Sequence, residues 1–233
     1  MQPYLFPYLG YFQLLHAVDT LVLYDDVTYI NRGWINRNRL LVNGAPWLFT
    51  LPLANASQNV LIKNLRLADW LAAWRQKWLK TLAHAYAKAT YFGETQALIE
   101  PLLHQSSPWL IDWLEDSLRT LAAALGLSAH FKRSSADPLP PATDAQARIL
   151  QRCAREGAGL YINPINGRAL YQATAFAEQG IALRFLRSQA PAYRQSHAPF
   201  VPHLSIVDTL MFAGLAGTRA LLPQYELVTD ELA

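Results

Sequence analysis

The sequence predicts an α/β fold with a mainly parallel sheet, crossover helices and a helical insertion in the middle of the chain. Strand-like apolar runs alternate with helix-like segments near both ends, as in folds whose parallel strands are joined by crossover helices. Between residues 68 and 126, apolar stripes at helical spacing replace the strands. We therefore expect a single α/β domain over residues 1–233, with 68–126 as a helical insertion.

The chain is expected to open with a strand, a turn and a helix. Residues 1–6 form a short apolar run, Pro7 to Gly10 supply turn residues, and residues 11–16 have the pattern of a short helix. The next strand is expected over residues 20–24, which are almost all apolar or β-branched. Asn43-Gly44 predicts a hairpin turn. Further strands of this third are expected over residues 34–42, 47–53 and 59–67.

Two long helices are expected in the centre of the chain. After Asp69, an apolar or aromatic residue recurs every four positions from Trp70 to Tyr86. A second helix, with a leucine stripe, begins after the N-cap signature Ser107-Pro108 and ends at Gly126. Stripes of this kind are typical of core helices or subunit contacts, so they receive no catalytic role.

The last third is expected to return to alternating strands and helices after a polar, proline-rich loop over residues 134–141. Thr143 to Gln146 has the spacing of a capping box and predicts a helix start. Ser205, with Asp208 three positions on, predicts the start of the final helix. The elements between them are expected to be a strand over residues 160–162, a helix over 168–179 ended by Gly180, and a strand over 181–186.

Composition and charge exclude several classes of function. Apolar residues make up 52% of the chain and charged residues 16%, and the formal net charge is only +3. We therefore expect no nucleic-acid partner, whereas a small anionic ligand is compatible with this charge. The single cysteine, Cys153, rules out a disulfide framework, and no cysteine or histidine spacing suggests a metal site. No apolar run is long enough to cross a membrane and no leader pattern is recognised, so we expect a cytoplasmic protein without membrane insertion.

The turn from Pro7 to Tyr11 is the first candidate site. A strand that breaks here and enters a helix places backbone N–H groups and a positive dipole end at the sheet edge. Gly10 would let a ligand approach the backbone closely, and Tyr8 and Tyr11 add hydroxyl groups. The turn is either a cradle for phosphate or carboxylate, or an aromatic turn that only packs.

Two carboxylates end the expected buried strand and form the second candidate. Asp25 or Asp26 could hold a substrate ammonium, a hydroxyl group or a metal ion. Ligands of parallel α/β sheets bind beyond the carboxyl ends of the strands. That rule predicts that Asp25-Asp26, the Pro7-to-Gly10 turn and residues 163–167, beginning with Asn163, border one crevice.

Amide and guanidinium side chains alternate just after the two carboxylates. In an extended segment Asn36 and Asn38 share one face, whereas Arg37 and Arg39 share the other. Two arginines at this spacing can bind phosphate in bidentate fashion, and the asparagines are candidates for sugar hydroxyls. The alternative is an exposed hairpin in which opposite charges neutralise each other.

A third polar cluster lies near the C-terminus, where Tyr193 and Gln195 precede two histidines. His197 is a candidate acid–base group or a solvent-facing side chain. His203 is expected to cap or pack at the start of the final helix, and Asp208 to complement the helix dipole.

Several phrases of the sequence together resemble the WbqC-like protein family across nearly the whole chain. The phrases that carry the resemblance are Gln2-Pro3-Tyr4, Phe6-Pro7-Tyr8, Gly10-Tyr11-Phe12-Gln13-Leu14, Asp25-Asp26-Val27, Gly33-Trp34-Ile35-Asn36-Arg37-Asn38-Arg39, Tyr161-Ile162-Asn163-Pro164, Tyr193-Arg194-Gln195 and the segment from Phe200 to Asp208. Gln2, Gln13, Asn163, Tyr193 and Gln195 lie within them and join the candidate substrate-binding residues.

The resemblance implies a bacterial protein whose relatives are often encoded with surface-polysaccharide (O-antigen) genes. It suggests a transferase acting on a nucleotide-linked amino sugar, for example by adding an aminoacyl group such as glycyl. The alternative is a non-catalytic protein of the same pathway that binds a sugar nucleotide or assists assembly. Because charged residues are few, we also expect a homodimer, with the two central stripes as its surface.

The turn from Tyr8 to Tyr11 also resembles the His-x-Gly-His turn of nucleotidyltransferase-like (HUP-like) adenylating enzymes, with tyrosine at both histidine positions. That resemblance implies ATP, with Mg²⁺, as a co-substrate. An aminoacyl transferase needs such activation, because a free carboxylate is a poor acyl donor. This reading stands beside the plain transferase and the binding protein as a third hypothesis.

Overall fold

A computed structural model of the protein describes residues 1–189, 192–196 and 199–229. Its helices are α1 (Leu9–Ala17), α2 (Leu71–Tyr86), α3 (Phe92–Ile99), α4 (Leu110–Ala124), α5 (Ala145–Glu156), α6 (Ala173–Ala177) and α7 (Ile206–Leu221). Its strands are β1 (Thr20–Leu23), β2 (Arg37–Val42), β3 (Ala45–Thr50), β4 (Leu53–Ala54), β5 (Arg66–Leu67), β6 (His130–Arg133), β7 (Leu160–Pro164), β8 (Ala182–Ser188) and β9 (Tyr225–Val228). Short 3-10 turns lie at η1 (Ile62–Asn64), η2 (Pro101–His104), η3 (Ser134–Ala136) and η4 (Ile165–Leu170).

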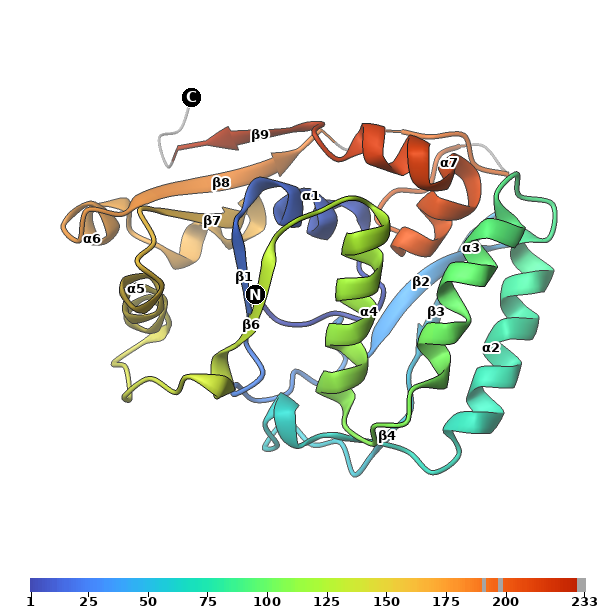
Figure 1. Cartoon of the computed structure of the whole chain (residues 1–233), viewed down its shortest axis with the longest axis horizontal. Coiled ribbons are helices and arrows are strands. Elements are labelled where there is room, and N and C mark those ends of the chain that lie inside the picture. The colour runs from blue at the N-terminus through green and yellow to red at the C-terminus, as the bar shows by residue number, and fades with distance from the viewer. Residues whose placement is uncertain (190–191, 197–198, 230–233) are drawn as a thin grey trace.

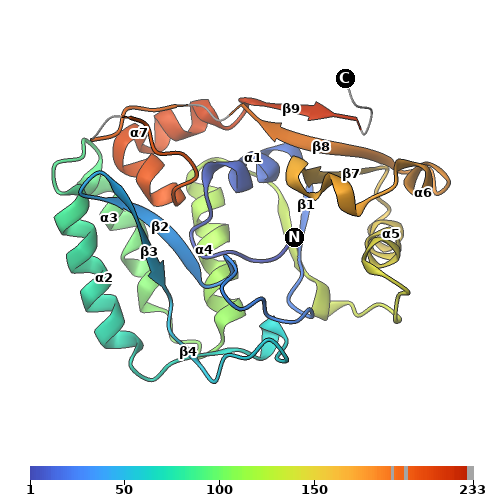
Figure 2. The ribbon, with the colours of Figure 1, turned by 180° about the vertical axis from the view of Figure 1, so that it is seen from behind.

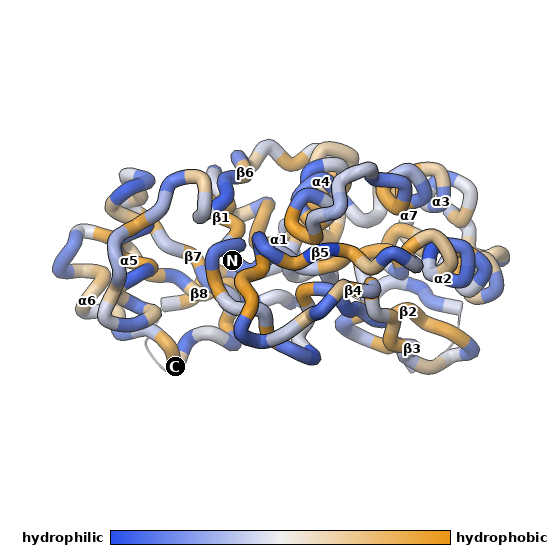
Figure 3. The backbone as a smooth tube through the Cα atoms, turned by 90° about the horizontal axis from the view of Figure 1, so that it is seen from below, coloured by the Kyte–Doolittle hydropathy of each residue, from blue (hydrophilic) through white to orange (hydrophobic). Residues whose placement is uncertain are grey.

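The elements divide into two groups at opposite ends of the long axis (Figures 1 and 3). The long helices α2, α3 and α4 and the hairpin β2–β3 form one end, and α5, α6 and the β7–β8–β9 sheet form the other. Between them lie α1 and the pair β1–β6. The buried apolar side chains follow the same division, with a large cluster around α1, α2 and α4 and a small one around Cys153, Phe176 and Phe185.

The strands form four small sheets in the described part of the chain, so the expected α/β class is confirmed but the single mainly parallel sheet is wrong. β1 pairs with β6 in parallel, and β7 pairs with β8 in parallel. β9 joins β8 antiparallel, and β2–β3 and β4–β5 are antiparallel pairs. The parallel pairs stay separate because no hydrogen bond joins β1 to β7.

The first expected strand, residues 1–6, does not form. Only Met1 is bound to β1: its terminal nitrogen donates to the Val22 carbonyl at 2.7 Å, and the Tyr24 N–H donates to the Met1 carbonyl at 2.9 Å. The chain then turns away, and by Leu5 its N–H donates to the Ile35 carbonyl, next to β2. The segment is therefore irregular because it connects two different sheets.

The hairpin β2–β3 has the turn that the sequence predicts. Asn43 and Gly44 both have positive φ, 51° and 75°, and Val42 pairs with Ala45 across the two-residue loop. Two left-handed residues give the twist that a short hairpin needs, which is why asparagine and glycine occur here. Figure 2 shows the hairpin lying beside α2, with which β2 is in contact.

The two central helices are confirmed, and their stripes face the interior of the same chain. Trp78, Leu82 and Tyr86 of α2 are buried, as are the leucines of α4, while Trp70 at the start of α2 is 60% exposed. The stripes therefore belong to the core and do not provide the dimer surface that we expected. The same region also contains α3, which the sequence pattern did not reveal.

The C-terminal third agrees with the prediction for its strands and final helix but differs in between. Asp144, one residue after Thr143, is the N-cap of α5, and its side chain accepts a hydrogen bond from the Ala147 N–H at 2.8 Å. The expected helix over 168–179 is wrong, because only the five residues of α6 are α-helical there. Tyr171 is extended and packs its ring against Phe176, which interrupts the helix.

Candidate functional site

The turn into α1 is built around the ring of Tyr8. Tyr8 is the N-cap, and its carbonyl accepts a hydrogen bond from the Tyr11 N–H at 3.0 Å. A Cβ added to Gly10 would lie 2.3 Å from Cε2 of Tyr8, so only glycine fits against this ring. The ring is thus held over the first turn of α1, and burial raises the pKa of the Tyr8 phenol.

Two residues next to this turn have left-handed backbones although neither is glycine. Phe6 has φ of 39° and His203 has φ of 57°. Conformations of this kind cost about 1–3 kcal/mol each and cluster at functional sites. The Phe6 carbonyl is fixed by two buried donors, Asn38 Nδ2 and Ser205 Oγ, both at 2.7 Å. The Tyr8 and His203 rings meet edge to face, with centroids 5.9 Å apart.

Asn36 and Asn38 are buried, and both are occupied by hydrogen bonds within the protein. Asn38 Nδ2 also donates to the Leu5 carbonyl at 2.9 Å. Asn36 accepts a hydrogen bond from the Tyr29 hydroxyl and donates to the Leu51 carbonyl, each at 2.8 Å. In this structure the two amides fix the loop that precedes α1 and the start of β2.

Arg37 and Arg39 lie on the other face of β2, as the alternation predicts. Arg37 donates to the backbone carbonyls of Gly33 and Arg32. Arg39 reaches the His203 carbonyl at 3.4 Å, and its guanidinium lies over the Trp34 ring at 5.1 Å from the centroid. Arg39 therefore connects β2 to the strained residue beside the Tyr8 turn.

Asp208 of α7 is the buried centre of the C-terminal cluster. Its Oδ1 accepts a hydrogen bond from the Tyr86 hydroxyl at 2.8 Å. Its Oδ2 accepts hydrogen bonds from the Tyr193 hydroxyl at 2.6 Å and from Gln195 Nε2 at 2.9 Å. Burial raises the pKa of Asp208, an effect that these three donors oppose.

A small pocket joins these parts. Its wall includes Tyr8 and Gly10 of the α1 turn, Tyr193 and His203 of the C-terminal loop, and Thr209 of α7. Its volume is about 40 Å³, enough for little more than one water molecule or the end of a larger ligand. Both α1 and α7 begin here, since the Ile206 N–H at the start of α7 donates to the Pro7 carbonyl at 2.9 Å. The first turns of α1 and α7 therefore lie side by side at this pocket.

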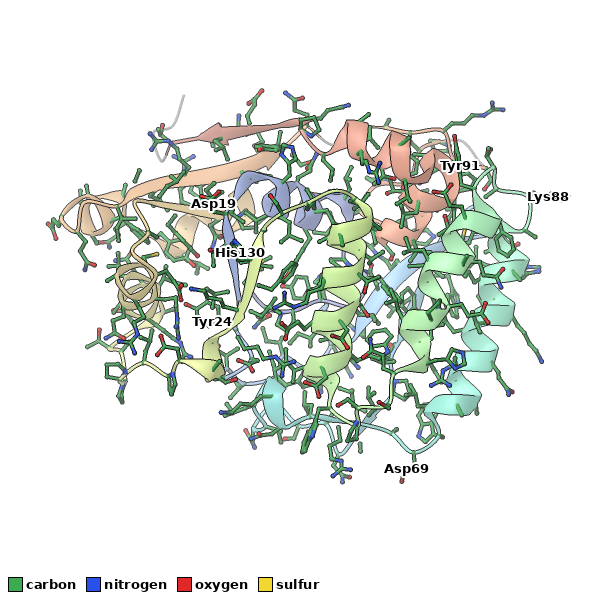
Figure 4. All side chains as sticks on the ribbon, in the orientation of Figure 1. Asp19, Tyr24, Asp69, Lys88, Tyr91 and His130 are labelled. Atoms are coloured by element: carbon green, nitrogen blue, oxygen red, sulfur yellow. The ribbon has the colours of Figure 1, made fainter. Side chains whose placement is uncertain are left out.

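Asp25 and Asp26 lie elsewhere, at the carboxyl ends of β1 and β6. Asp25 is buried and accepts hydrogen bonds from the Ser135 N–H at 2.9 Å and the Ser135 hydroxyl at 2.5 Å. Asp26 is in contact with the Ser134 hydroxyl and forms an ion pair with Arg148 of α5 at 2.6 Å. In Figure 4 this end of β1 is marked by Tyr24, away from α7.

The remaining candidates are distributed over several places. Asn163 is the last residue but one of β7 and donates to the Tyr161 hydroxyl at 2.8 Å. The Gln2 carbonyl accepts a hydrogen bond from the Tyr11 hydroxyl at 3.1 Å. Gln13 is buried, and its amide donates to the carbonyls of Leu221 and Gln224 at the end of α7. His197 lies outside the described residues.

The structure thus unites the first and third clusters and leaves the carboxylate pair apart. Sequence reasoning missed Tyr86, which was counted as part of an apolar stripe, and Thr209. It also missed Ser134, Ser135 and Arg148, which bind the two aspartates. The signal for the serines was weak: they follow β6, a strand of only four mostly polar residues.

No group of three histidine, cysteine, aspartate or glutamate side chains in the described ranges is arranged to hold a metal ion. Among the same residues, no helix is both long and apolar enough to cross a membrane.

Fold and pocket together define a mixed α/β protein with a tyrosine-lined pocket where two helices begin. A family model described as the WbqC-like protein family matches residues 2–220, so the chain belongs to that family. The chain is also similar to a protein of Mycobacterium tuberculosis (strain ATCC 25618 / H37Rv) called Uncharacterized protein Rv1507c. The two are 27% identical over 215 residues, which cover 89% of this chain and 90% of that protein. No solved structure matches the chain.

Proposed function

We propose that the protein is a small-molecule transferase that acts on a nucleotide-linked amino sugar in the synthesis of a bacterial surface polysaccharide. The observation that carries the proposal is the meeting of the Tyr8 turn, the loop from Tyr193 to His203 and the start of α7 at one pocket. Such a place suits a ligand with anionic and hydroxyl groups, because two helix N-termini supply positive potential and the tyrosines supply donors.

In this proposal the pocket binds one end of the ligand, and the rest extends over the surface beside it. Tyr8, Tyr193 and His203 contact the ligand, while Asn38, Arg39 and Asp208 position them through the bonds described above. The transfer itself would add an aminoacyl group, such as glycyl, to the amine of the sugar. The reaction forms an amide bond to the sugar amine and breaks the bond between the acyl carbon and the leaving group of an activated donor. The leaving group departs, and the proton lost by the amine goes to it or to water.

The first test is binding and turnover with the hydroxyl of Tyr8 removed. Tyr8→Phe should weaken binding of a nucleotide-linked amino sugar by about 10-fold, which corresponds to one lost hydrogen bond of about 1.4 kcal/mol. Tyr91→Phe, at a side chain that is 37% exposed where α3 begins, is the matched control and should bind normally. Equal binding by wild type and Tyr8→Phe, measured by calorimetry, would remove the pocket from the proposal.

A non-catalytic binding protein of the same pathway is the second candidate, and the hydrogen bonding of the carboxylates favours it. Asp25, Asp26 and Asp208 all accept bonds from neighbouring groups, so none is a free general base in this structure. Turnover by the wild type separates the two functions, and Asp26→Asn tests whether the carboxylate pair takes part in it. An enzyme that uses Asp26 should lose turnover while retaining ligand binding; if the ligand binds and no acyl donor gives turnover even with the wild type, the binding function holds.

An adenylating enzyme of nucleotidyltransferase-like type is the third candidate. The turn from Tyr8 to Tyr11 supports it, because the turn lies at a helix N-terminus, where backbone N–H groups can bind phosphate. The pocket fits phosphate better than Mg²⁺, because its carboxylate, Asp208, is behind Tyr193 and already accepts three hydrogen bonds. Amino-acid-dependent exchange of pyrophosphate into ATP tests this candidate, and no exchange with any amino acid would eliminate it.

A further inference from the structure

Three buried hydrogen-bond donors without an acceptor lie near the end of β1, outside the proposed ligand pocket. They are the Tyr24 hydroxyl and the Nε atoms of Arg148 and Arg152, none of which has a hydrogen-bond partner among the described residues. Tyr24, labelled in Figure 4, directly follows β1, and both arginines belong to α5. Native proteins leave few buried donors unpaired, so three of them in one place call for an explanation.

The three donors form one cluster. The Arg148 guanidinium lies over the Tyr24 ring, 5.5 Å from its centroid. Arg152 is four residues further along α5 and therefore on the same side of the helix. Burial raises the pKa of the Tyr24 phenol to about 12, and the positive charges of Arg152 and Arg148 oppose this rise. At neutral pH the phenol keeps its proton and remains a donor.

Other bonds hold both guanidinium groups in place. Arg148 forms its ion pair with Asp26 at 2.6 Å through Nη2. Nη2 of Arg152 donates to the carbonyls of Ser134 at 3.2 Å and Asp137 at 2.8 Å. A guanidinium has five N–H donors and no acceptor, so each arginine can keep these bonds and still donate from Nε.

The end of β7 adds a further donor. Asn163 Nδ2 donates to the hydroxyls of Tyr161 at 2.8 Å and Tyr171 at 3.3 Å, and the two hydroxyls are 3.3 Å apart. One hydroxyl can donate to the other, which leaves one O–H without an acceptor in the described part of the chain. A Cβ on Gly167 would lie 2.3 Å from Asn163 Oδ1, so glycine is needed for the amide to take this position.

A cavity of about 540 Å³ connects the two groups of donors. Its wall includes Tyr24 and Arg152 on one side and Tyr161 and Asn163 on the other. The cavity thus reaches the carboxyl ends of the parallel strands β1 and β7, where ligands of α/β folds bind.

The unpaired groups select the chemistry of the ligand. Two phenols and two guanidinium groups each offer one hydrogen for which the described residues provide no acceptor. Carboxylates already balance the charges of the arginines, since Asp26 pairs with Arg148, and Asp137 and Glu156 lie 3.6 Å from Arg152. The donors and not the net charge therefore decide which ligand fits. An oxyanion has several acceptors and no donor, whereas a sugar hydroxyl would bring a donor of its own.

We propose that Tyr24, Arg148, Arg152 and the Tyr161–Tyr171 pair form a second ligand site, which binds the oxyanion of a small molecule, either a phosphate or a carboxylate group. The Tyr24 hydroxyl and the two Nε–H groups donate to the oxyanion from the β1 side, and the remaining phenol hydrogen donates from the β7 side. The Arg148 side chain is 34% exposed and that of Arg152 is 6% exposed, so the oxyanion enters past Arg148.

NMR of the arginine Nε–H groups tests the proposal in the full chain. Inorganic phosphate and, separately, acetate are added to about 100 mM at constant ionic strength, which detects binding with a Kd in the millimolar range. The Nε–H signals of Arg148 and Arg152 should shift and saturate with one or both anions, and the anion with the lower Kd identifies the oxyanion. Arg155 is the internal control, because its Nε already donates to Asp137 at 2.7 Å, and its signal should not follow the same curve.

Tyr24→Phe is the sharpest variant, because the hydroxyl that it removes has no partner in the protein to lose. Its Tm should equal or exceed that of the wild type, while its affinity for the anion should fall about 10-fold, the effect of one hydrogen bond. Arg148→Lys keeps a positive charge beside Asp26 and removes the Nε–H, so it should also weaken binding. Tyr91→Phe, where α3 begins, is the matched control and should bind the anion as the wild type does.

Two results would overturn the proposal. One is the absence of a saturating shift at Arg148 and Arg152 with both anions. The other is equal affinity of the wild type and Tyr24→Phe for the anion that binds. Neither result bears on the Tyr8 pocket, because the two sites share no residue.

Discussion

Asp208 connects the two halves of the candidate site through three hydrogen bonds. It accepts one hydrogen bond from Tyr86, at the helical end of the molecule. It accepts the other two from Tyr193 and Gln195, in the loop that borders the pocket. Gln195 in turn exchanges two hydrogen bonds with the backbone of Val201. The carboxylate thus fixes the course of the loop over the Tyr8 turn.

Asp208→Asn should lower the free energy of unfolding by about 1–3 kcal/mol, because an amide offers an N–H where the carboxylate accepted a bond. The loss should depend on pH in a defined direction. Burial raises the pKa of Asp208 above 3.8, so the folded protein binds this proton more tightly than the unfolded chain. The free energy of unfolding of the wild type should therefore exceed that of the variant most near and below pH 3.8. This difference should shrink as the pH rises.

Urea unfolding of wild type and Asp208→Asn at several pH values measures this difference. Asp69→Asn, at an exposed side chain, is the control and should show no such trend. If the difference in free energy of unfolding between wild type and variant grew with increasing pH, burial would not favour the protonated carboxyl group of Asp208, and the account of this residue would be contradicted.

Gly10 is the residue on which the position of the Tyr8 ring depends. Gly10→Ala places a Cβ 2.3 Å from the Tyr8 ring, so the ring must move or the first turn of α1 must distort. We expect a loss of about 1–3 kcal/mol in the free energy of unfolding and weaker ligand binding. Gly93→Ala in α3 meets nothing within 4 Å and should instead gain about 0.5–1 kcal/mol. Denaturant unfolding of the two variants measures whether Gly10→Ala is less stable and Gly93→Ala more stable than the wild type. Equal changes in the free energy of unfolding would contradict the packing of Gly10 against Tyr8.

At the scale of elements, α2 does more than cover the core. The Tyr86 hydroxyl accepts a hydrogen bond from the Leu41 N–H of β2 at 2.7 Å and donates to Asp208 of α7. The helix therefore joins the hairpin β2–β3 to the helix that supports the pocket. Tyr86 ends a stripe whose spacing indicates only a buried face.

Tyr86→Phe should destabilise the protein by about 1–3 kcal/mol, because it leaves the buried Leu41 N–H without an acceptor and Asp208 with one donor fewer. Tyr91→Phe keeps the ring that packs against Gly214 and should change stability by less than about 0.5 kcal/mol. Thermal unfolding compares the two, and faster amide exchange at Leu41 in Tyr86→Phe alone would locate the effect. Equal Tm values for Tyr86→Phe and Tyr91→Phe would show that the Tyr86 hydroxyl contributes nothing to stability.

The elements differ in how far the sequence could predict them. α4 was predictable because leucines mark one face and Gly126 marks its end, although the helix begins at Leu110 with Trp109 as N-cap and not at the expected Ser107-Pro108. β6 and β9 have only four residues each, too few for a pattern of their own, and each is defined by its neighbour in a sheet. Residues 1–6 have the composition of a strand, but their backbone beyond Met1 finds partners near β2.

The candidate site was predictable in part for the same reason. Tyr8, Gly10, Tyr193 and His203 stand in distinctive local phrases, whereas the bond from Tyr86 to Asp208 joins residues 122 positions apart. No local pattern reports such a contact. The Asp25-Asp26 pair was expected beside the Tyr8 turn but does not lie there. The turn precedes the N-terminus of α1, whereas the two aspartates follow β1, which begins after the C-terminus of α1.

At the scale of the whole molecule, the homodimer remains a prediction, and its surface must lie outside the buried stripes. The exposed apolar side chains include Trp70, Trp109 and Leu48, which are 60%, 38% and 46% exposed. Sedimentation at micromolar concentration should give about twice the mass of 26.2 kDa. A single species of monomer mass would refute the dimer.

The central claim is that the ligand binds where α1 and α7 begin. A crystal structure of the protein soaked with a nucleotide-linked amino sugar tests it most directly. The account predicts ligand density within hydrogen-bond distance of Tyr8 and next to Tyr193 and His203. Density beside Asp25 and Asp26, or in the cavity lined by β1 and β7 with the Tyr8 pocket empty, would contradict it.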